Sequence, residues 1–190
     1  TNNRVGIGTV SPDTLLEISS DSASELSITR YHSSTTQVPK LNLRKARGTA
    51  AAPAIIVDGD TIGYVNFQTN DAGDDGFHSV ARISAKVDGG AGSGDVPASL
   101  HFFTSGDGEL SAGSSNERMA IKSDGNVGIG TDTPVATAIL ELSSSAKGFL
   151  PPRLTATQRN AISSPAEGLV VYNDTTNQLN VYNGRAWTIA

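Results

Sequence analysis

Short runs in which apolar and polar residues alternate extend along most of the chain, and turns rich in Gly and Asp separate them. The clearest run is residues 81–87, where four apolar side chains alternate with three polar ones. A period of two is typical of a strand with one buried face. Similar runs lie at residues 26–28, 41–43, 62–67, 100–102 and 119–121. The pattern therefore predicts a mainly β fold.

A linker and a helix are predicted after residue 146. Residues 149–152 read Phe-Leu-Pro-Pro, which predicts an extended, rigid segment. Thr155 and Gln158 have the spacing of a capping box, in which each side chain hydrogen-bonds the other residue's backbone N–H. We therefore expect one short helix near residues 156–162, ending before Pro165.

The last part of the chain, residues 168–190, contains three further apolar runs, half of the four tyrosines and the single tryptophan. These runs predict a small β meander. Asn183-Gly184 between the last two runs predicts a two-residue hairpin turn.

One motif occurs twice. Val-Gly-Ile-Gly-Thr at residues 5–9 recurs at residues 127–131, and each copy has a proline three residues later. Each copy then continues into an apolar-Glu-apolar-Ser-Ser segment, at residues 16–20 and 140–144. Two ordered copies so far apart indicate related modules in series, not a solenoid of short period.

The motif predicts a strand with two different faces. A branched side chain alternates with glycine, so one face is apolar and the other carries no side chains. A bare face allows another backbone to approach closely. We expect the proline to end this strand and the following segment to begin another.

Large apolar side chains are scarce. Leu, Ile, Val and Phe make up 43 of the 190 residues, only just above the roughly 20% below which chains tend to remain disordered. A single chain could therefore bury only a thin core, and contact with identical neighbours would relieve the shortage.

The composition also argues against several kinds of site. Without cysteine there is no disulfide, thiolate metal site or cysteine nucleophile. The three histidines have no metal-ligand spacing, the net charge of −5 argues against nucleic-acid binding, and no apolar run is long enough to cross a bilayer. We therefore expect no catalytic, cofactor or metal site, no nucleic-acid partner and no membrane insertion.

The sequence resembles bacteriophage tail fibres and tailspikes. Asp-Gly-Asn-Val-Gly-Ile-Gly-Thr at residues 124–131, followed by Pro134 and Leu140-Glu141, is similar to a recurrent element of those proteins. Further similar segments are residues 41–44, 59–67, 81–85, 100–104, 117–121 and 147–155. The order of the segments is more specific than any one of them.

The resemblance implies an elongated, homotrimeric virion protein of a tail fibre or related appendage, which helps the phage attach to its host. Its partners would be two further copies of itself and other tail or baseplate proteins. Many such fibres carry a C-terminal intramolecular chaperone of the endosialidase type. None is visible up to residue 190, and on this resemblance we expect a chaperone either to have been cleaved off or never to have belonged to this version.

On this basis we divide the chain into four segments. They are an N-terminal VGIGT shaft motif (1–21), a central β module (22–123), a second VGIGT shaft motif (124–146), and a linker, short helix and meander (147–190). In a trimer we expect Val5, Ile7, Val127 and Ile129 to pack at or near the three-fold axis, with the glycine faces permitting close backbone approach.

A carbohydrate-binding tip is the first alternative function. Tyr172, Tyr182 and Trp187 could provide an aromatic platform for a host surface glycan. The plainer interpretation is that these rings form the core of the meander, because large aromatic side chains contribute most by packing.

A glycan-cleaving tailspike is the second alternative. Hydrolysis needs two carboxylates roughly 5–9.5 Å apart, one of them with a raised pKa. The acidic pairs Asp58/Asp60, Asp74/Asp75 and Asp107/Glu109 all lie in Gly-rich turns, where we expect carboxylates to be solvated and mobile. The sequence therefore favours a structural, non-enzymatic fibre protein.

Overall fold

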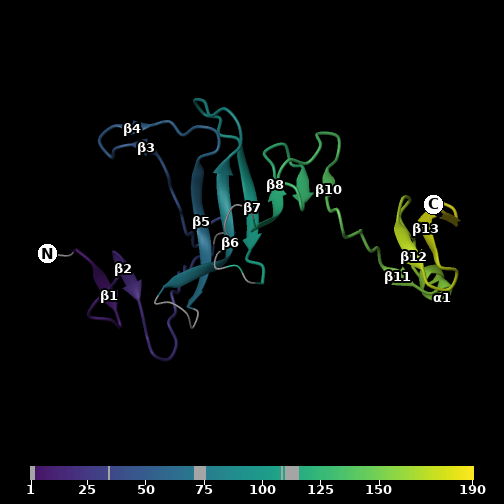
Figure 1. Cartoon of the computed structure of the whole chain (residues 1–190), viewed down its shortest axis with the longest axis horizontal. Coiled ribbons are helices and arrows are strands. Elements are labelled where there is room, and N and C mark those ends of the chain that lie inside the picture. The colour runs from purple at the N-terminus through teal and green to yellow at the C-terminus, as the bar shows by residue number, and fades with distance from the viewer. Residues whose placement is uncertain (1–2, 34, 71–75, 108, 110–115) are drawn as a thin grey trace. The chain divides into compact units, whose positions relative to one another are not determined.

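The computed structural model describes residues 3–33, 35–70, 76–107, 109 and 116–190. The chain divides into two compact units, Thr1–Arg44 and Lys45–Ala190. Within the described residues, regular structure consists of β-strands and one short helix (Figure 1). The mainly β fold with a single short helix is thus confirmed.

The first unit contains one pair of strands. β1 (Val5–Ile7) lies parallel to β2 (Leu16–Ile18), with Val5 opposite Leu16 and Ile7 opposite Ile18. No strand occurs in residues 19–33 or 35–46. The strands expected at residues 26–28 and 41–43 are therefore wrong for the single chain, because an alternating segment becomes a strand only where a second backbone completes its hydrogen bonds.

The second unit begins with a small hairpin and continues into a six-stranded sheet. The hairpin joins β3 (Arg47–Gly48) and β4 (Pro53–Ala54). The sheet has the order β10-β9-β8-β7-β6-β5. Its strands are β5 (Thr61–Asn70), β6 (Phe77–Val87), β7 (Ala98–Thr104), β8 (Glu117–Ile121), β9 (Val127–Ile129) and β10 (Leu140–Leu142).

Neighbouring strands of this sheet are antiparallel except β9 and β10, which are parallel. The second copy of the duplicated motif therefore continues the sheet of the central residues, as Figure 1 shows. The alternation did not reveal this pairing, because it marks strands without saying which of them are neighbours.

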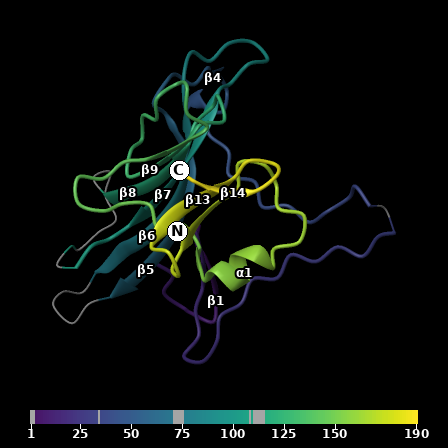
Figure 2. The same ribbon diagram turned by 90° about the vertical axis from the view of Figure 1, so that its right-hand side faces the viewer.

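A four-stranded sheet forms the C-terminal region. β11 (Arg153–Leu154) is parallel to β12 (Val170–Asn173), and β13 (Gln178–Tyr182) and β14 (Trp187–Ile189) follow as the predicted meander. Helix α1 (Ala156–Asn160) contacts β11 and β12, and Figure 2 shows it beside this sheet.

The capping box of α1 is confirmed. The Thr155 hydroxyl accepts a hydrogen bond from the Gln158 N–H at 3.3 Å, and the Gln158 side chain accepts one from the Thr155 N–H at 2.9 Å. These bonds satisfy two backbone donors that the first turn would otherwise leave free.

The hairpin turn between β13 and β14 is centred one residue later than predicted. The N–H of Asn183 donates to the carbonyl of Ala186 at 3.1 Å, so Gly184 and Arg185 are the two central residues. The Asn183 side-chain oxygen accepts from the N–H groups of Arg185 and Ala186, which fixes Asn183 at the first turn position. Gly184 then takes the positive φ of 86°.

A buried carboxylate fastens the start of β5. Asp60 accepts hydrogen bonds from the Arg47 guanidinium at 2.7 and 2.9 Å, from Lys45 Nζ at 3.2 Å and from the Val57 N–H at 3.0 Å. Its side chain is only 9% exposed. The expectation of a solvated, mobile carboxylate is therefore wrong for Asp60, because two cations and a backbone donor surround it.

Because of these contacts, the free energy of unfolding should fall when the pH is lowered into the acid range. The Arg47 hydrogen bond, followed by that of the Val57 N–H, holds the pKa of Asp60 well below its usual value. A pKa lowered by folding contributes stability above the unfolded-state pKa of about 4, and this is lost as the pH falls further. We expect the melting temperature to fall between about pH 5 and about pH 2. Asp60→Asn should show a smaller fall in thermal melts, whereas Asp132→Asn, at an exposed position, should match the unmodified chain.

Candidate self-association surface

The two copies of the duplicated motif fold in the same way, although the connection between their two strands is two residues longer in the second copy. The glutamate of each second strand accepts a hydrogen bond from the residue that follows the proline. Glu17 Oε2 accepts from the Asp13 N–H at 2.7 Å, and Glu141 Oε2 accepts from the Val135 N–H at 2.7 Å. The proline thus lies in the connection between the two strands, which the glutamate holds in place.

Glycine, not proline, ends the first strand of each copy, so that expectation is wrong. Gly8 and Gly130 have φ values of 81° and 78°. This left-handed conformation breaks the strand directly after β1 and β9, and residues with a Cβ adopt it at a cost.

Backbone atoms of the same chain explain why glycines occupy the bare face, because they leave no room for a Cβ. A Cβ on Gly128 would lie 2.2 Å from the Thr131 carbonyl oxygen, and one on Gly130 would lie 2.1 Å from the Ser143 carbonyl oxygen. The first copy shows the same close approaches, at 2.3 and 2.0 Å. The backbone that approaches these glycines is therefore that of their own connecting loop and second strand.

One face of the six-stranded sheet is apolar across its full width. Cross-strand pairing places one row of side chains on a single face: Val65, Ile83, Phe102, Met119, Ile129 and Leu142. The adjacent row on the same face is Gly63, Ala85, Leu100, Ile121, Val127 and Leu140. We call these twelve residues the apolar face.

The apolar face is largely uncovered in the single chain. Its most exposed members lie between 36% and 51% exposed: Leu100, Ile83, Ile129, Val65, Leu142 and Leu140. A contiguous apolar surface of this kind usually marks an interface between proteins. Of the four residues expected at a three-fold axis, Val127 and Ile129 belong to this face. Val5 and Ile7, on β1, are 57% and 54% exposed.

The opposite face of the sheet carries polar and aromatic side chains that cover one another. The Arg82 guanidinium carbon lies 4.3 Å from the ring centre of Phe103 and 5.5 Å from that of Tyr64. Lys86 Nζ lies 5.4 Å from the same Phe103 ring, which is 1% exposed. Long cationic side chains thus cover the Phe103 ring on this face.

A histidine bridges two strands on the same polar face. His101 Nδ1 lies 2.9 Å from Glu117 Oε2, and His101 Nε2 lies 2.8 Å from the Ser99 hydroxyl. Ser99 is 5% exposed and His101 4%. Ser99, His101 and Glu117 thus form a connected row of a hydroxyl, an imidazole and a carboxylate. Burial keeps the Ser99 hydroxyl from any substrate, and the three side chains join β7 to β8.

Asp88 ties the end of β6 to the turn after β8. Its carboxylate accepts from Lys122 Nζ at 2.6 Å and from the Ser123 N–H at 2.9 Å. Burial by itself raises the pKa of Asp88, but these hydrogen bonds outweigh it, and the pKa lies below its usual value.

The aromatic residues considered for glycan contact do not form one platform. Tyr182 and Trp187 pair across β13 and β14, with ring centres 5.5 Å apart in a T-shaped arrangement. Tyr172 pairs with Leu179, three residues before Tyr182, so alternation places it on the opposite face of the sheet. The guanidinium carbon of Arg159, on α1, lies 5.7 Å from the centre of the Trp187 ring. The helix therefore packs on the face of the sheet that carries Tyr182 and Trp187.

The other face of this C-terminal sheet is a second surface without a helix. Val170, Tyr172, Leu179 and Val181 lie on it and are half-buried or exposed, whereas Val171, Asn173 and Asn180 on the helix side are buried. Sequence reasoning marked these runs as strands and did not identify which face the helix would leave open.

Three described carboxylates of the acidic pairs are held by backbone N–H groups or cations. Asp58 Oδ1 accepts from the Gly89 N–H at 2.7 Å, while Asp60 is held by its cations. Glu109 accepts from the Gly106 N–H at 2.6 Å within a turn. Asp74 and Asp75 lie outside the described residues.

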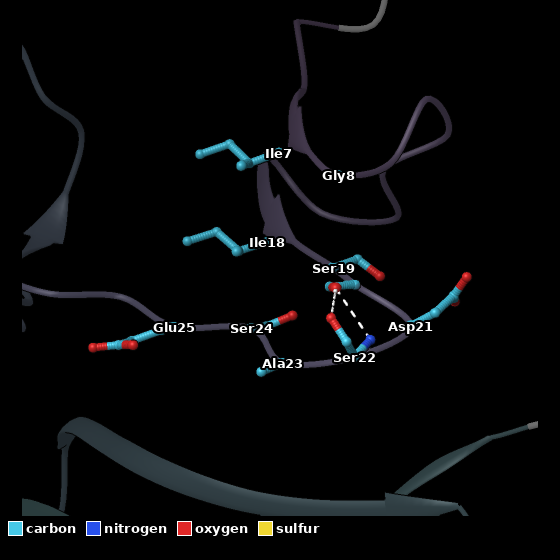
Figure 3. Close-up of a pocket in the computed structure, with 10 residues that line it drawn as sticks. Ile7, Gly8, Ile18, Ser19, Asp21, Ser22, Ala23, Ser24 and Glu25 are labelled. Carbon is cyan, nitrogen blue, oxygen red and sulfur yellow. Dashed lines mark hydrogen bonds between the residues drawn. The ribbon is translucent and has the colours of Figure 1, made fainter.

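The hollows of the described surface are shallow. One of about 750 Å³ lies on the first unit, where residues 18–25 bend past Ile7 and Gly8 (Figure 3). Its polar groups are serine hydroxyls and the carboxylates of Asp21 and Glu25, and the hydroxyls of Ser20 and Ser22 lie 3.1 Å apart in a hydrogen bond. Among the described residues no three His, Asp or Glu side chains come together as metal ligands. No described helix is long and apolar enough to span a membrane.

Comparison with known proteins gives a match to one family model and matches to solved structures. Residues 128–190 match the family model of a phage tail like trimerisation region. No curated protein sequence matches the chain.

Two solved structures of the carboxy-terminal domain of the bacteriophage T5 L-shaped tail fibre have a similar fold. One, solved with its intra-molecular chaperone domain, is 18% identical with a TM-score of 0.53 and covers 80% of this chain and 38% of its own. The other is 10% identical with a TM-score of 0.50, and the match covers 83% of this chain and 66% of the tail-fibre chain. The chain thus spans less than two thirds of each.

At such identities the structural likeness shows the fold, while the family model covers the C-terminal third of the chain. Both findings agree with the motifs at residues 124–131 and 147–155. The resemblance to the phage tail fibre family is therefore confirmed, with a trimerisation region matched at residues 128–190.

Proposed function

We propose that the chain is a structural part of a phage tail fibre or related virion appendage, and that it acts as an elongated homotrimer. The apolar face is the observation that supports this most strongly. An antiparallel sheet usually turns its apolar face to a core and its polar face to water. Here the polar face is already closed by its own side chains, and the apolar face has no cover in the described chain.

Three copies arranged around an axis supply that cover. Each buried Ile, Leu, Val or Phe side chain contributes roughly 1.5–3 kcal/mol relative to full exposure, and half-exposed ones contribute less. The six half-exposed members of each apolar face therefore give a trimer a large favourable free energy. In this arrangement Val127 and Ile129 lie near the axis, and Val5 and Ile7 occupy the equivalent place in the first copy of the motif.

The homotrimer would present its C-terminal region to other tail proteins or to the host. The match to a trimerisation region over residues 128–190 supports self-association there. The face of the C-terminal sheet that carries Val170, Tyr172, Leu179 and Val181 offers a second contact between copies. The fibre would belong to a tail appendage of the virion. Attachment to the host would then depend on the fibre as a whole.

The mass of the purified chain in solution tests this proposal. Light scattering coupled to size-exclusion chromatography should give three times 19.6 kDa. A stable species of 19.6 kDa at micromolar concentration would contradict the proposal, and a dimer would contradict the three-fold arrangement.

A glycan-binding tip is the second candidate function. The environment of Trp187 distinguishes it from a purely structural role. Trp187 is half-buried, stacks edge-on against Tyr182 and lies beneath Arg159. We expect Trp187→Ala to lower the stability of the C-terminal sheet by about 2–3 kcal/mol, because a large aromatic contact is lost. The change should leave the six-stranded sheet folded.

Fluorescence of the single tryptophan gives the measurement. A blue-shifted emission that resists acrylamide quenching agrees with packing. Red-shifted, easily quenched emission, together with loss of glycan binding at unchanged stability in Trp187→Ala, would favour the glycan-binding tip instead. Thr176→Ala is the matched control, because Thr176 is exposed in the turn between β12 and β13 of the same sheet and should change neither emission nor stability.

We propose no catalytic role. The carboxylates at residues 58, 60 and 109 each hold a turn or an ion pair, which supports a structural use of these groups. Incubation of purified protein with capsular polysaccharide or lipopolysaccharide should release no reducing sugar. Sustained release that survives further purification would overturn this point.

A further inference from the structure

The two copies of the duplicated motif share the hydrogen bonds that join their paired strands. Val5 N–H donates to the Leu15 carbonyl at 2.8 Å, as Val127 N–H does to that of Ile139 at 2.9 Å. At the other end, the carbonyl of Ile7 accepts from the Ser19 N–H at 2.9 Å. The carbonyl of Ile129 accepts from the Ser143 N–H at the same distance. The side chains of Ile7 and Ile18 point the same way from this pair (Figure 3).

The copies differ on the other edge of the first strand. β9 has β8 as a second neighbour. The Gly130 N–H donates to the Arg118 carbonyl at 3.0 Å, and the Asn126 carbonyl accepts from the Lys122 N–H at 2.9 Å. β1 has no such neighbour in the described chain.

Exposure and hydrogen bonding both show the missing neighbour. Gly128 is buried, whereas its equivalent Gly6 is exposed. The N–H of Gly8 and the carbonyl of Arg4 correspond to the groups that bond β8 in the second copy. Neither makes a hydrogen bond within the described residues. An open strand edge of this kind is a ready template for another strand.

The second copy also shows what the open edge requires of its occupant. Ala120 lies opposite Gly128 and is 0% exposed, so there is room for only a small side chain at that position. Its neighbours Met119 and Ile121 lie opposite Ile129 and Val127. The occupant must therefore be an antiparallel strand with an apolar–small–apolar sequence.

We propose that the free edge of β1 accepts such a strand from a β module that precedes this one along the fibre. The strand would pair with β1 as β8 pairs with β9, with its small residue against Gly6. Each VGIGT unit then joins two modules: its first strand pairs with the last strand of the module before it, and the chain continues from its second strand into the next. This lengthwise junction is distinct from the contact between copies around an axis and does not depend on it.

An extended version of the full chain tests the proposal. A copy of residues 115–126, which contains β8 and its turn, is placed directly before Val5 in place of residues 1–4. Hydrogen–deuterium exchange of residues 5–9 is then followed by mass spectrometry. We expect exchange at Gly6 and Gly8 to slow by at least about tenfold, because their N–H groups gain partners. The matched control carries Ala120→Glu in the appended copy, which cannot fit against Gly6 and should leave exchange fast.

Two results would overturn the proposal. One is unchanged exchange at residues 5–9 in the extended chain while β6 to β9 stay protected, which shows that the strand does not dock. The other is slow exchange at residues 5–9 in the unmodified protein, which shows that another copy already covers the edge. The mass in solution is recorded for each variant, so failure of the trimer is seen separately from failure of the junction.

Discussion

Replacing Ile83 and Ile129 together with glutamate is expected to leave the chain monomeric. Both side chains lie on the apolar face and are 37% and 43% exposed in the single chain, so each glutamate remains solvated in a monomer. In a trimer the same positions face other copies, where an unpaired charge costs several kcal/mol. The expected result in light scattering is a shift from three chains to one.

The matched control for this double change is Tyr64→Glu. Tyr64 is 51% exposed and lies on the opposite, polar face of the same sheet. It should leave the mass unchanged and alter stability only through the lost contact with Arg82. A trimer that persists in Ile83→Glu/Ile129→Glu, with the circular dichroism of the unmodified chain, would show that the apolar face is not the contact between copies.

Replacing Gly128 and Gly130 together with valine should prevent β9 and β10 from forming. The new Cβ atoms would overlap the carbonyl oxygens of Thr131 and Ser143, at 2.2 and 2.1 Å. The Gly130 conformation also costs a residue with a side chain roughly 1–2 kcal/mol before any overlap is counted. We expect the β8–β10 end of the six-stranded sheet to lose cooperative unfolding, and trimer content to fall with it because Val127 and Ile129 lose their position.

Gly148→Ala is the control for that change. Nothing lies within 4 Å of a Cβ at Gly148, so stability and mass should be unaffected. If Gly128→Val/Gly130→Val kept the melting temperature of the unmodified chain, the close approach of the loop to these glycines would not be needed for the fold. An intact β9–β10 pair in a chain that no longer forms trimers would instead place the bare glycine face at the contact between copies.

Local features of the sequence were sufficient for the elements that depend on local contacts. The capping box at Thr155 and Gln158 predicted where α1 begins, because both partners lie within four residues. Alternation over residues 81–87 predicted β6, because side chains of a strand point to opposite faces in turn. The duplicated motif predicted two copies of one structural unit, and the structure contains them as β1–β2 and β9–β10.

Tertiary structure decided everything that depends on which backbone meets which. Alternation at residues 26–28 and 41–43 gave no strand in the single chain, since no second backbone supplies their hydrogen bonds. Asp60 lies in a Gly-rich turn, yet it is buried because Lys45 and Arg47 return to it. The hydrophobic pattern marks the apolar side of each strand separately. Only the register across β5 to β10 joins these sides into one uncovered face, because strand pairing depends on contacts between residues far apart in the sequence.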